Sequence, residues 1–314
     1  MTSGASSIHM NQSGIGKIDE KKATTAYPEP LIIPPSARHT HTCVLLHGRG
    51  SNGEEFGVGF ITSRTSSGKM LPQHFPGMKF IFPTAKKGRA TVYNRAVINQ
   101  WFDNHSLEEP SEHQELQVEG LRESGAFVRQ IILHEANAVT LENIIVGGLS
   151  QGCAMALHVL LSFESDVVEN GALGGFVGMS GWLPFQNSLE EIVNASYEHH
   201  NIDDPFERDH TDSIHDNQSV GVRVMDFVRD NMDLPPMTTD LPACLQTPVF
   251  LGHGEADEKV SAKLGLQAAS TLERMGMDVT WRGYEKFGHW YKVPEEIDDV
   301  VDFLRFKVGI YLTR

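Results

Sequence analysis

Cysteine is scarce in this sequence: the 314 residues hold only Cys43, Cys153 and Cys244. An odd number of cysteines without regular spacing excludes the disulfide framework of a small secreted protein. Cys43 lies in an apolar run and Cys153 follows a glycine-rich turn. Both are expected to be small buried thiols, which fits a reducing compartment.

Long hydrophobic runs are missing as well. No stretch of about 18 apolar residues occurs, so no membrane-spanning helix is expected. Residues 1–26 are polar and rich in glycine and serine, and they lack the apolar centre of a signal peptide. We expect a disordered N-terminal extension, followed by a single domain at 27–314, in a cytoplasmic protein with no integral membrane segment.

Positive charge is in deficit, because 41 acidic residues outnumber 26 lysines and arginines and leave a net charge of −15. A chain this acidic, with no basic stripe, is not expected to bind nucleic acid or anionic lipid. Its hydrophobic content of 40% is ordinary for a globular protein. The length suits one large α/β domain or two small ones.

Short apolar segments alternate with helical patterns along most of the chain. A proline-stopped edge strand is expected at 31–35, and buried strands at 41–46, 78–83, 142–148, 174–181, 248–254 and 278–284. Helices are expected at 120–138, 260–275 and 295–312. Apolar, non-alternating strands separated by helices predict an α/β fold with a mostly parallel central sheet and helices on both faces.

An insertion at about 185–245 interrupts this alternation, since no strand is evident there. Its part at 198–218 is acidic and rich in histidine, whereas 220–232 places Val224, Met225, Val228 and Met232 on one helical face. A gap of this length is typical of a lid, an inserted subdomain or disorder. Two interpretations stay open: a partial cap beside the substrate site, or a surface loop.

Residues 147–153, GGLSQGC, follow the apolar run Ile144–Val146 and precede good helix formers. This pattern indicates a strand, a tight turn and a helix, with Gly148 and Gly152 relieving crowding at the turn. It matches the G-x-S-x-G nucleophile elbow, which exposes a serine hydroxyl at its apex. An ordinary Gly-Ser turn is the alternative, so the catalytic interpretation of Ser150 needs a base and further donors.

Two later loops could supply that base and its partner. Asp257 follows the strand expected at 248–254, and His289 follows the strand expected at 278–284. The order Ser, Asp, His is that of the α/β-hydrolases, with His289 as base and Asp257 as the group that orients it. Asp257 could instead cap the next helix, and Glu255 and Glu258 are rival carboxylates.

Backbone N–H groups are expected to form the oxyanion hole. One is the N–H of Gln151, directly after the nucleophile, and the other lies in the glycine-rich loop after 41–46, where we choose Arg49. The guanidinium of Arg49 could also favour substrates that carry a carboxylate or phosphate.

Six segments in the same order resemble one family: LLHGRGSNG, WFD, GLSQGCAMAL, MSGWLP, HGEADEKV and GHW. Together they resemble the acyl-protein thioesterase/carboxylesterase (lysophospholipase-like) branch of the α/β-hydrolases, over about 40–184 and 246–314. The resemblance implies a single-domain esterase or thioesterase with Ser150, Asp257 and His289 as its triad and Arg49 and Gln151 at the oxyanion hole. It implies a substrate site lined by Trp101, Phe102, Trp182 and Leu183.

The chain departs from that family in three places. Arg49 and Ser51 stand where the family commonly has Leu and Asp, Cys153 stands where Gly is usual, and the insertion is much longer. These departures leave a hydrolase but put a protein-deacylating role in doubt.

The sequence therefore predicts a serine hydrolase that cleaves carboxylic esters or thioesters through an acyl-enzyme and needs no cofactor. A depalmitoylating thioesterase acting on acylated proteins and a lysophospholipase are narrower alternatives. Two hypotheses from other classes are a metal-binding protein using the histidines at 199–215 and a non-catalytic binding protein on a hydrolase fold. The histidines lack regular metal spacing, so no metal site is expected.

Overall fold

A computed structural model describes residues 26–164, 171–200 and 218–311. The extension predicted at 1–26 lies almost entirely outside these residues, and so does most of the histidine-rich stretch at 198–218.

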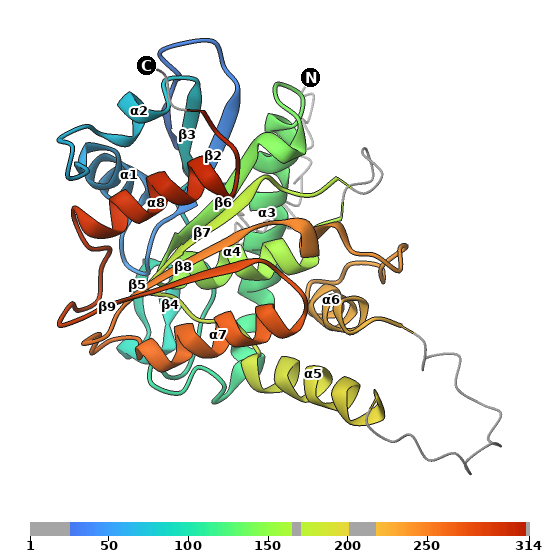
Figure 1. Ribbon diagram of the computed structural model, residues 1–314. Helices are drawn as coiled ribbons and strands as arrows, with labels where there is room; N and C mark the ends of the chain where they lie inside the picture. Colours follow the sequence, from blue (N-terminus) through green and yellow to red (C-terminus); the bar gives the residue numbers. More distant parts are fainter. Residues whose placement is uncertain (1–25, 165–170, 201–217, 312–314) are drawn as a thin grey trace, which may run out of the picture.

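One seven-stranded sheet forms the centre of the molecule (Figure 1). All neighbouring strands are parallel except the edge strand β1, which pairs antiparallel with β3. The predicted mostly parallel sheet and its proline-stopped edge strand are thus confirmed. In spatial order the strands are β1 (Leu31–Ile33), β3 (Met78–Phe82), β2 (His41–Leu46), β6 (Ile144–Leu149), β7 (Gly175–Met179), β8 (Val249–Gly254) and β9 (Val279–Tyr284).

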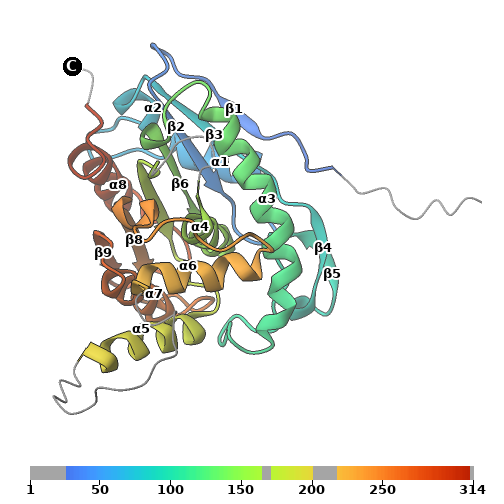
Figure 2. The same ribbon diagram turned by 90° about the vertical axis from the view of Figure 1, so that its right-hand side faces the viewer.

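Helices cover both faces of the sheet (Figures 1 and 2). Alternate residues of a strand point to opposite faces, so Val44 and Leu46 enter one core, while Cys43 and Leu45 enter the other. Both faces are apolar, which explains the non-alternating strand sequences. One layer holds α1 (Gly53–Thr62), α2 (Leu71–His74) and α8 (Glu295–Phe306); the other holds α3 (Val118–Glu135), α4 (Gln151–Ser162), α5 (Gln186–His200), α6 (Val220–Asn231) and α7 (Ala262–Arg274).

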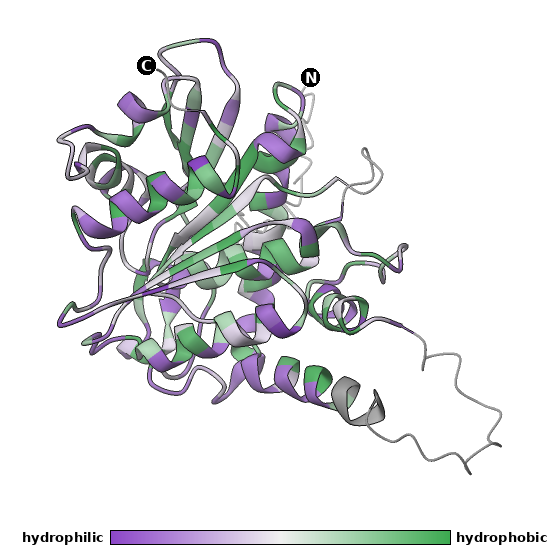
Figure 3. Cartoon of the chain, in the orientation of Figure 1, coloured by the Kyte–Doolittle hydropathy of each residue, from purple (hydrophilic) through white to green (hydrophobic). Residues whose placement is uncertain are grey.

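Hydropathy follows this layered arrangement. Figure 3 shows the hydrophobic colour gathered on the central strands, with hydrophilic residues on the outer sides of the helices. Cys43 and Cys153 are free and buried, as predicted, and Cys244 is free and buried as well.

The last helix is shorter than predicted, because α8 ends at Phe306 and not near 312. Gly309 adopts a φ of 84°, and the Ile310 N–H donates to Leu304 O at 2.9 Å, which turns the chain back onto the helix end. Val308, predicted to lie on the helical face, therefore packs against the core from outside the helix.

A small hairpin that the sequence pattern did not predict lies beside the sheet. It joins β4 (Lys87–Ala90) to β5 (Ala96–Asn99), and Asn94 and Arg95 both have positive φ at its turn. The end of this hairpin touches the loop after β2, since the Gly50 N–H donates to Asn99 O at 2.8 Å. The hairpin thereby supports a loop at the carboxyl edge of the sheet.

Candidate active site

Ser150 occupies a sharp turn between β6 and α4 with φ 56° and ψ −121°, a backbone conformation that L-residues rarely adopt. The two glycines around it lie so close to a neighbouring backbone segment that neither position has room for a Cβ. A Cβ on Gly148 would lie 2.5 Å from Leu46 O, and one on Gly152 would lie 2.2 Å from the same atom. The strand, the turn and the helix predicted around GGLSQGC are confirmed, with the steric reason for both glycines.

His289 lies in the loop after β9 and joins two of the predicted residues. Its Nε2 is 3.0 Å from Ser150 Oγ, and its Nδ1 is 2.7 Å from Asp257 Oδ2. A carboxylate only accepts, so Nδ1–H donates to Asp257 and Nε2 is the atom that can accept the serine proton. Three residues from the carboxyl ends of β6, β8 and β9 thus form one hydrogen-bonded chain.

The carboxylate of Asp257 is fully buried at the end of β8. Its Oδ1 accepts the N–H groups of Lys259 at 2.8 Å and Val260 at 2.9 Å. Burial alone would raise the pKa of Asp257, but hydrogen bonds from His253, His289 and Val260 outweigh it and hold that pKa far below its usual range. The group is an anion at neutral pH.

The alternatives for this carboxylate do not fit the geometry. Ser261, and not Asp257, caps α7, because its hydroxyl accepts the Lys263 N–H at 3.3 Å. Glu255 and Glu258 are exposed.

His253 is a further partner of Asp257 that the sequence analysis missed. It is 1% exposed, and its Nε2 lies 3.2 Å from Asp257 Oδ2 and 2.9 Å from Val260 O. It therefore holds Oδ2 of the carboxylate, while the Val260 N–H holds Oδ1. The signal was present in the sequence, since His253 precedes Asp257 by four residues within HGEAD.

The loop after β2 runs close to Ser150, because a Cβ on Gly48 would lie 3.4 Å from Ser150 Cβ. The N–H groups of Gly50 and Ser51 are bound to Asn99 O and Gly48 O. This leaves the Arg49 N–H as the candidate oxyanion donor of the turn. Gln151 is the first residue of α4, so its N–H has no acceptor within the helix.

Buried hydrogen bonds fix both donors. The Gln151 side chain accepts from Trp101 N–H at 3.0 Å and donates to Phe102 O at 2.6 Å. His47 donates from Nδ1 to Gly48 O at 2.7 Å and accepts the Ala85 N–H at Nε2. Burial lowers the pKa of His47 to about 4, so this imidazole is neutral and keeps both bonds at physiological pH.

A cleft opens above Ser150, lined also by Arg49, Gln151 and His289. Lys259 adds a second cationic side chain to its wall. The apolar part of the wall comes from Trp182, which was expected there, and from five residues that the sequence pattern did not connect to the site: Phe56, Leu107, Leu149, Val260 and Trp290.

Of the four residues expected to line the substrate site, only some border the cleft at Ser150. Trp182 lines the cleft, and Leu183 lines an adjacent hollow that Trp182 shares. Trp101 and Phe102 are only 1% and 2% exposed and line a different hollow from the cleft at Ser150, so their role in substrate binding stays a prediction. Trp101 donates from Nε1 to His47 O at 2.8 Å, so its side chain supports the oxyanion loop.

The described part of the insertion packs on the main core. Val224, Met225 and Val228 are fully buried, as the helical pattern at 220–232 predicted, and α6 lies against α3, α4 and α5. No described residue from 188 to 245 lines the cleft. Residues 201–217 lie outside the described part, so the cap interpretation stays a prediction.

Comparisons with known proteins identify the family of the chain. Residues 28–207 match the family model described as phospholipase/carboxylesterase. The chain belongs to this family. It is 28% identical to acyl-protein thioesterase 1 of Gibberella zeae over 279 residues, covering 88% of this chain and 94% of the relative. It is 26% identical to acyl-protein thioesterase 1 of Candida albicans over 279 residues, covering 88% of this chain and 96% of that relative.

Solved structures support the fold. The crystal structure of Zea mays acyl-protein thioesterase 2 matches with a TM-score of 0.61 and 24% identity, covering 90% of this chain and all of that one. Esterase PE8 matches with a TM-score of 0.58 and 18% identity, covering 88% of this chain and 97% of that one. The predicted α/β-hydrolase fold is confirmed, and the chain is a hydrolase of the carboxylesterase type.

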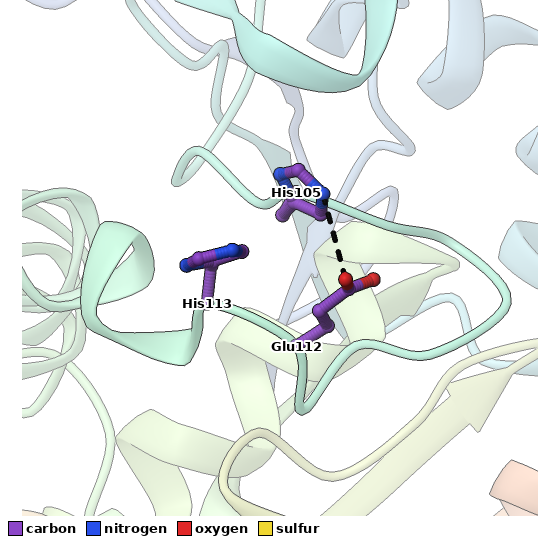
Figure 4. Close-up of side chains that lie close together, drawn as sticks. All are labelled: His105, Glu112 and His113. Atoms are coloured by element: carbon purple, nitrogen blue, oxygen red, sulfur yellow. Dashed lines mark ion pairs between the residues drawn. The ribbon is translucent and has the colours of Figure 1, made fainter.

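The part of the chain that the structure describes holds one candidate metal-binding group and no helix that could span a membrane. One group has spacing suited to a metal ion, His105, Glu112 and His113. The three exposed residues lie on one loop (Figure 4), and none of them lines the cleft. None of the described helices is both long and apolar enough to span a bilayer.

Proposed function

We propose that Ser150, His289 and Asp257 are the catalytic triad of this hydrolase, which cleaves carboxylic esters and thioesters through an acyl-enzyme. The observation that carries the proposal is the unbroken chain of contacts: 3.0 Å from Ser150 Oγ to His289 Nε2, and 2.7 Å from His289 Nδ1 to Asp257 Oδ2. The strained turn at Ser150 supports it, because such strain clusters at functional sites.

In the first half of the reaction, Ser150 Oγ attacks the substrate carbonyl carbon while its proton passes to His289 Nε2. Asp257 keeps Nδ1–H in place and stabilises the imidazolium that forms. The negative charge that develops on the carbonyl oxygen is stabilised by the N–H groups of Arg49 and Gln151. When the tetrahedral intermediate collapses, His289 gives its proton to the departing alcohol or thiol.

In the second half, a water molecule replaces the alcohol or thiol. His289 takes a proton from this water as it attacks the acyl carbon, and the same two N–H groups stabilise the second oxyanion. Collapse releases the carboxylic acid and returns the proton to Ser150 Oγ. No metal or cofactor takes part in this scheme.

The relatives' names concern acylated proteins, and an acylated protein is the narrower substrate that we propose to test beside small esters. The cleft supports an acyl chain, because Phe56, Leu107 and Trp182 contribute apolar wall next to Ser150. The three buried free thiols fit the reducing cytosol, which is the location that we propose.

The test is the variant Ser150→Ala, assayed with 4-nitrophenyl esters and acyl-thioesters of increasing chain length. Loss of the nucleophile is expected to lower turnover by a factor on the order of 10⁶, to background. Ser66→Ala, an exposed serine far along the chain, is the matched control and should keep the parent's turnover. Hydrolysis that survives in a folded Ser150→Ala protein would rule out the mechanism.

A further inference from the structure

The side chain of Arg49 has no role in the triad, although it lies close to it. Its backbone belongs to the oxyanion loop, while its side chain lines the cleft with Ser150 and His289. Nη2 donates to Oδ1 of Asn104, whose side chain is 0% exposed and donates in turn to Ser106 O at 2.5 Å. The guanidinium is therefore held by a rigid neutral partner.

The rest of this guanidinium has no protein partner. Nε and Nη1 are buried, and neither makes a hydrogen bond within the described part of the chain. The neighbouring carboxylate, Asp103, is taken up by the N–H and hydroxyl of Thr91 at 2.8 and 2.5 Å. Buried cationic N–H groups without an acceptor cost free energy, which an anionic ligand would recover.

Lysine and arginine side chains give the wall of the cleft a positive charge. Arg49 and Lys259 line it, and none of the lining residues is a carboxylate. This contrasts with a chain of net charge −15. Burial lowers the pKa of Arg49 only to about 10, with Tyr93 and Asp103 opposing the shift, so the group is still a cation at neutral pH.

We propose that Arg49, with Lys259 beside it, forms an anion subsite that selects ester or thioester substrates carrying a carboxylate on the acyl group. The inference rests on the proposed function, since the subsite adjoins the Ser150 nucleophile. The guanidinium of Arg49 is a fixed planar array of donors that suits a carboxylate, and the contact with the buried Asn104 side chain restricts its movement.

The test compares one anionic and one neutral substrate of similar size, mono-4-nitrophenyl glutarate and 4-nitrophenyl hexanoate. The quantity is the ratio of their kcat/KM values, in which any general loss of activity cancels. Arg49→Leu should lower this ratio roughly ten- to hundred-fold, since a hydrogen bond to a charged group is lost. Arg49→Lys should restore part of it, and Lys259→Gln should lower it less.

Arg38→Leu, which removes an exposed arginine away from the cleft, is the matched control and should leave the ratio unchanged. A ratio equal in the parent and Arg49→Leu would overturn the subsite. That result leaves the triad untouched, because the triad fails only if Ser150→Ala still hydrolyses both esters.

A second measurement separates carboxylate from phosphate. Free glutarate should inhibit hexanoate hydrolysis in the parent and lose at least about tenfold in potency in Arg49→Leu. If inorganic phosphate shows this Arg49 dependence and glutarate does not, the carboxylate proposal is wrong.

A different observation points to a metal site on the loop that follows Asn104. His105 Nε2 lies 3.7 Å from Glu112 Oε1, and the rings of His105 and His113 are 4.6 Å apart. The ligand atoms of all three residues lie within 4.8 Å of one another, and Figure 4 shows the side chains around a common space. Two imidazoles and a carboxylate form a ligand set that zinc accepts.

A carboxylate supports one of these ligands from behind. His113 Nδ1 is 3.1 Å from Glu115 Oε1, which leaves Nε2 as the metal-binding atom, as in the carboxylate–histidine arrangement of zinc sites. All three candidate ligands are exposed, so small rotations can close the remaining gaps. We infer that His105, Glu112 and His113 bind a zinc ion whose fourth ligand is water.

The loop gives this site a role. It begins beside Asn104, the partner of Arg49, and it contributes Leu107 to the cleft wall. A metal ion bound by His105 at one end and by Glu112 and His113 at the other would tie the loop closed over the cleft.

Zinc binding by calorimetry tests the inference. The parent should bind zinc at the site formed by His105, Glu112 and His113. The variants His105→Ala and His113→Ala should each lose zinc binding at that site. Glu115→Gln should weaken that site about 10- to 100-fold, as expected for a group that orients a ligand. His134→Ala, at an exposed position at the end of α3, is the matched control and should bind as the parent does.

The histidines at 199–215 could bind zinc independently, so a variant with His199, His200, His210 and His215 changed to Ser is measured alongside. It should keep the site that His105→Ala loses. Equal zinc binding in the parent and both single-histidine variants, or no binding in the parent, would overturn the inference.

Discussion

The backbone of Ser150 is strained. Its φ of 56° and ψ of −121° cost of order 1–3 kcal/mol for a residue with a Cβ. The turn persists because the Ser150 N–H donates to Met179 O at 2.8 Å and α4 begins at once after it. The strain projects the hydroxyl toward His289, so stability is given up here for reactivity.

Asp257→Asn tests the orienting role. The amide cannot accept as strongly from Nδ1–H, which releases the imidazole tautomer, and kcat should fall roughly 10⁴-fold. The measurement is steady-state kinetics on a 4-nitrophenyl ester. Glu258→Gln, one position away and exposed, is the matched control with near-normal kcat. If Glu258→Gln were the inactive variant, the assignment of Asp257 would be wrong.

Glu296 is a fully buried acid at the start of α8 that the mechanism does not use. Its Oε2 accepts the Lys292 N–H at 2.8 Å, while Oε1 has no partner within the described residues. Burial raises its pKa from 4.5 to about 8, and Asp299 adds to the rise. The folded protein thus keeps a proton on Glu296 that the unfolded chain releases above its ordinary pKa.

Stability should therefore depend on pH through this residue. Between the unfolded pKa of 4.5 and the folded pKa of about 8, the folded state binds more protons, so the free energy of unfolding falls as pH rises. Glu296→Gln removes the ionisation but keeps the acceptor for Lys292. The free energy of unfolding, measured by urea at three pH values across this window, should fall less with rising pH in the variant than in the parent. An identical pH dependence in the two proteins would contradict the assignment.

At the scale of elements, α6 decides how the insertion is understood. Val224, Met225 and Val228 fill the core between α3, α4 and α5, which makes the helix part of the structural layer. Met225→Ala should cost about 2–5 kcal/mol of unfolding free energy, because it leaves a cavity in a fully buried site. Asp230→Ala, exposed on the same helix, should change it little, and urea unfolding measures both.

Deleting the insertion is the stronger form of this test. If α6 belongs to the core, replacing 187–243 with a Gly/Ser linker should abolish cooperative unfolding. A folded deletion variant with the parent's melting temperature would show instead that the segment is a separable cap or loop.

The elements that the sequence revealed share a cause. Strands such as β2 and β6 are buried on both faces, so they appear as continuous apolar runs. The turn at GGLSQGC combined a steric need for glycine with a flanking strand and helix. Because the carboxyl ends of parallel strands lie on one edge, the meeting of Ser150, Asp257 and His289 could be expected.

Other features depend on contacts that no local pattern encodes. The β4–β5 hairpin turns at Asn94 and Arg95 without a glycine, so it lacked the usual signal. The sequence could not tell which aromatic residues face the cleft: Trp182 does, whereas Trp101 turns inward to bond His47 O. Leu107 reaches the cleft wall only through the tertiary fold.

At the scale of the whole molecule, the chain divides its tasks between the sheet and the loops at one edge. Two apolar cores, one on each face, hold seven strands in register. That rigid edge fixes the positions from which Ser150, Asp257 and His289 project, while the loops after β2 and β5 bring Arg49 and Leu107 around them and Gln151 follows Ser150 at the start of α4. The central claim is that this edge makes one serine, Ser150, nucleophilic.

Covalent labelling measures that claim most directly. The intact protein is treated with a fluorophosphonate, and its mass and the modified peptide are determined by mass spectrometry. We expect one adduct per chain, located on Ser150, that is absent from Ser150→Ala and present in Ser66→Ala. A label on another residue, or an equal label in the folded Ser150→Ala protein, would contradict the account.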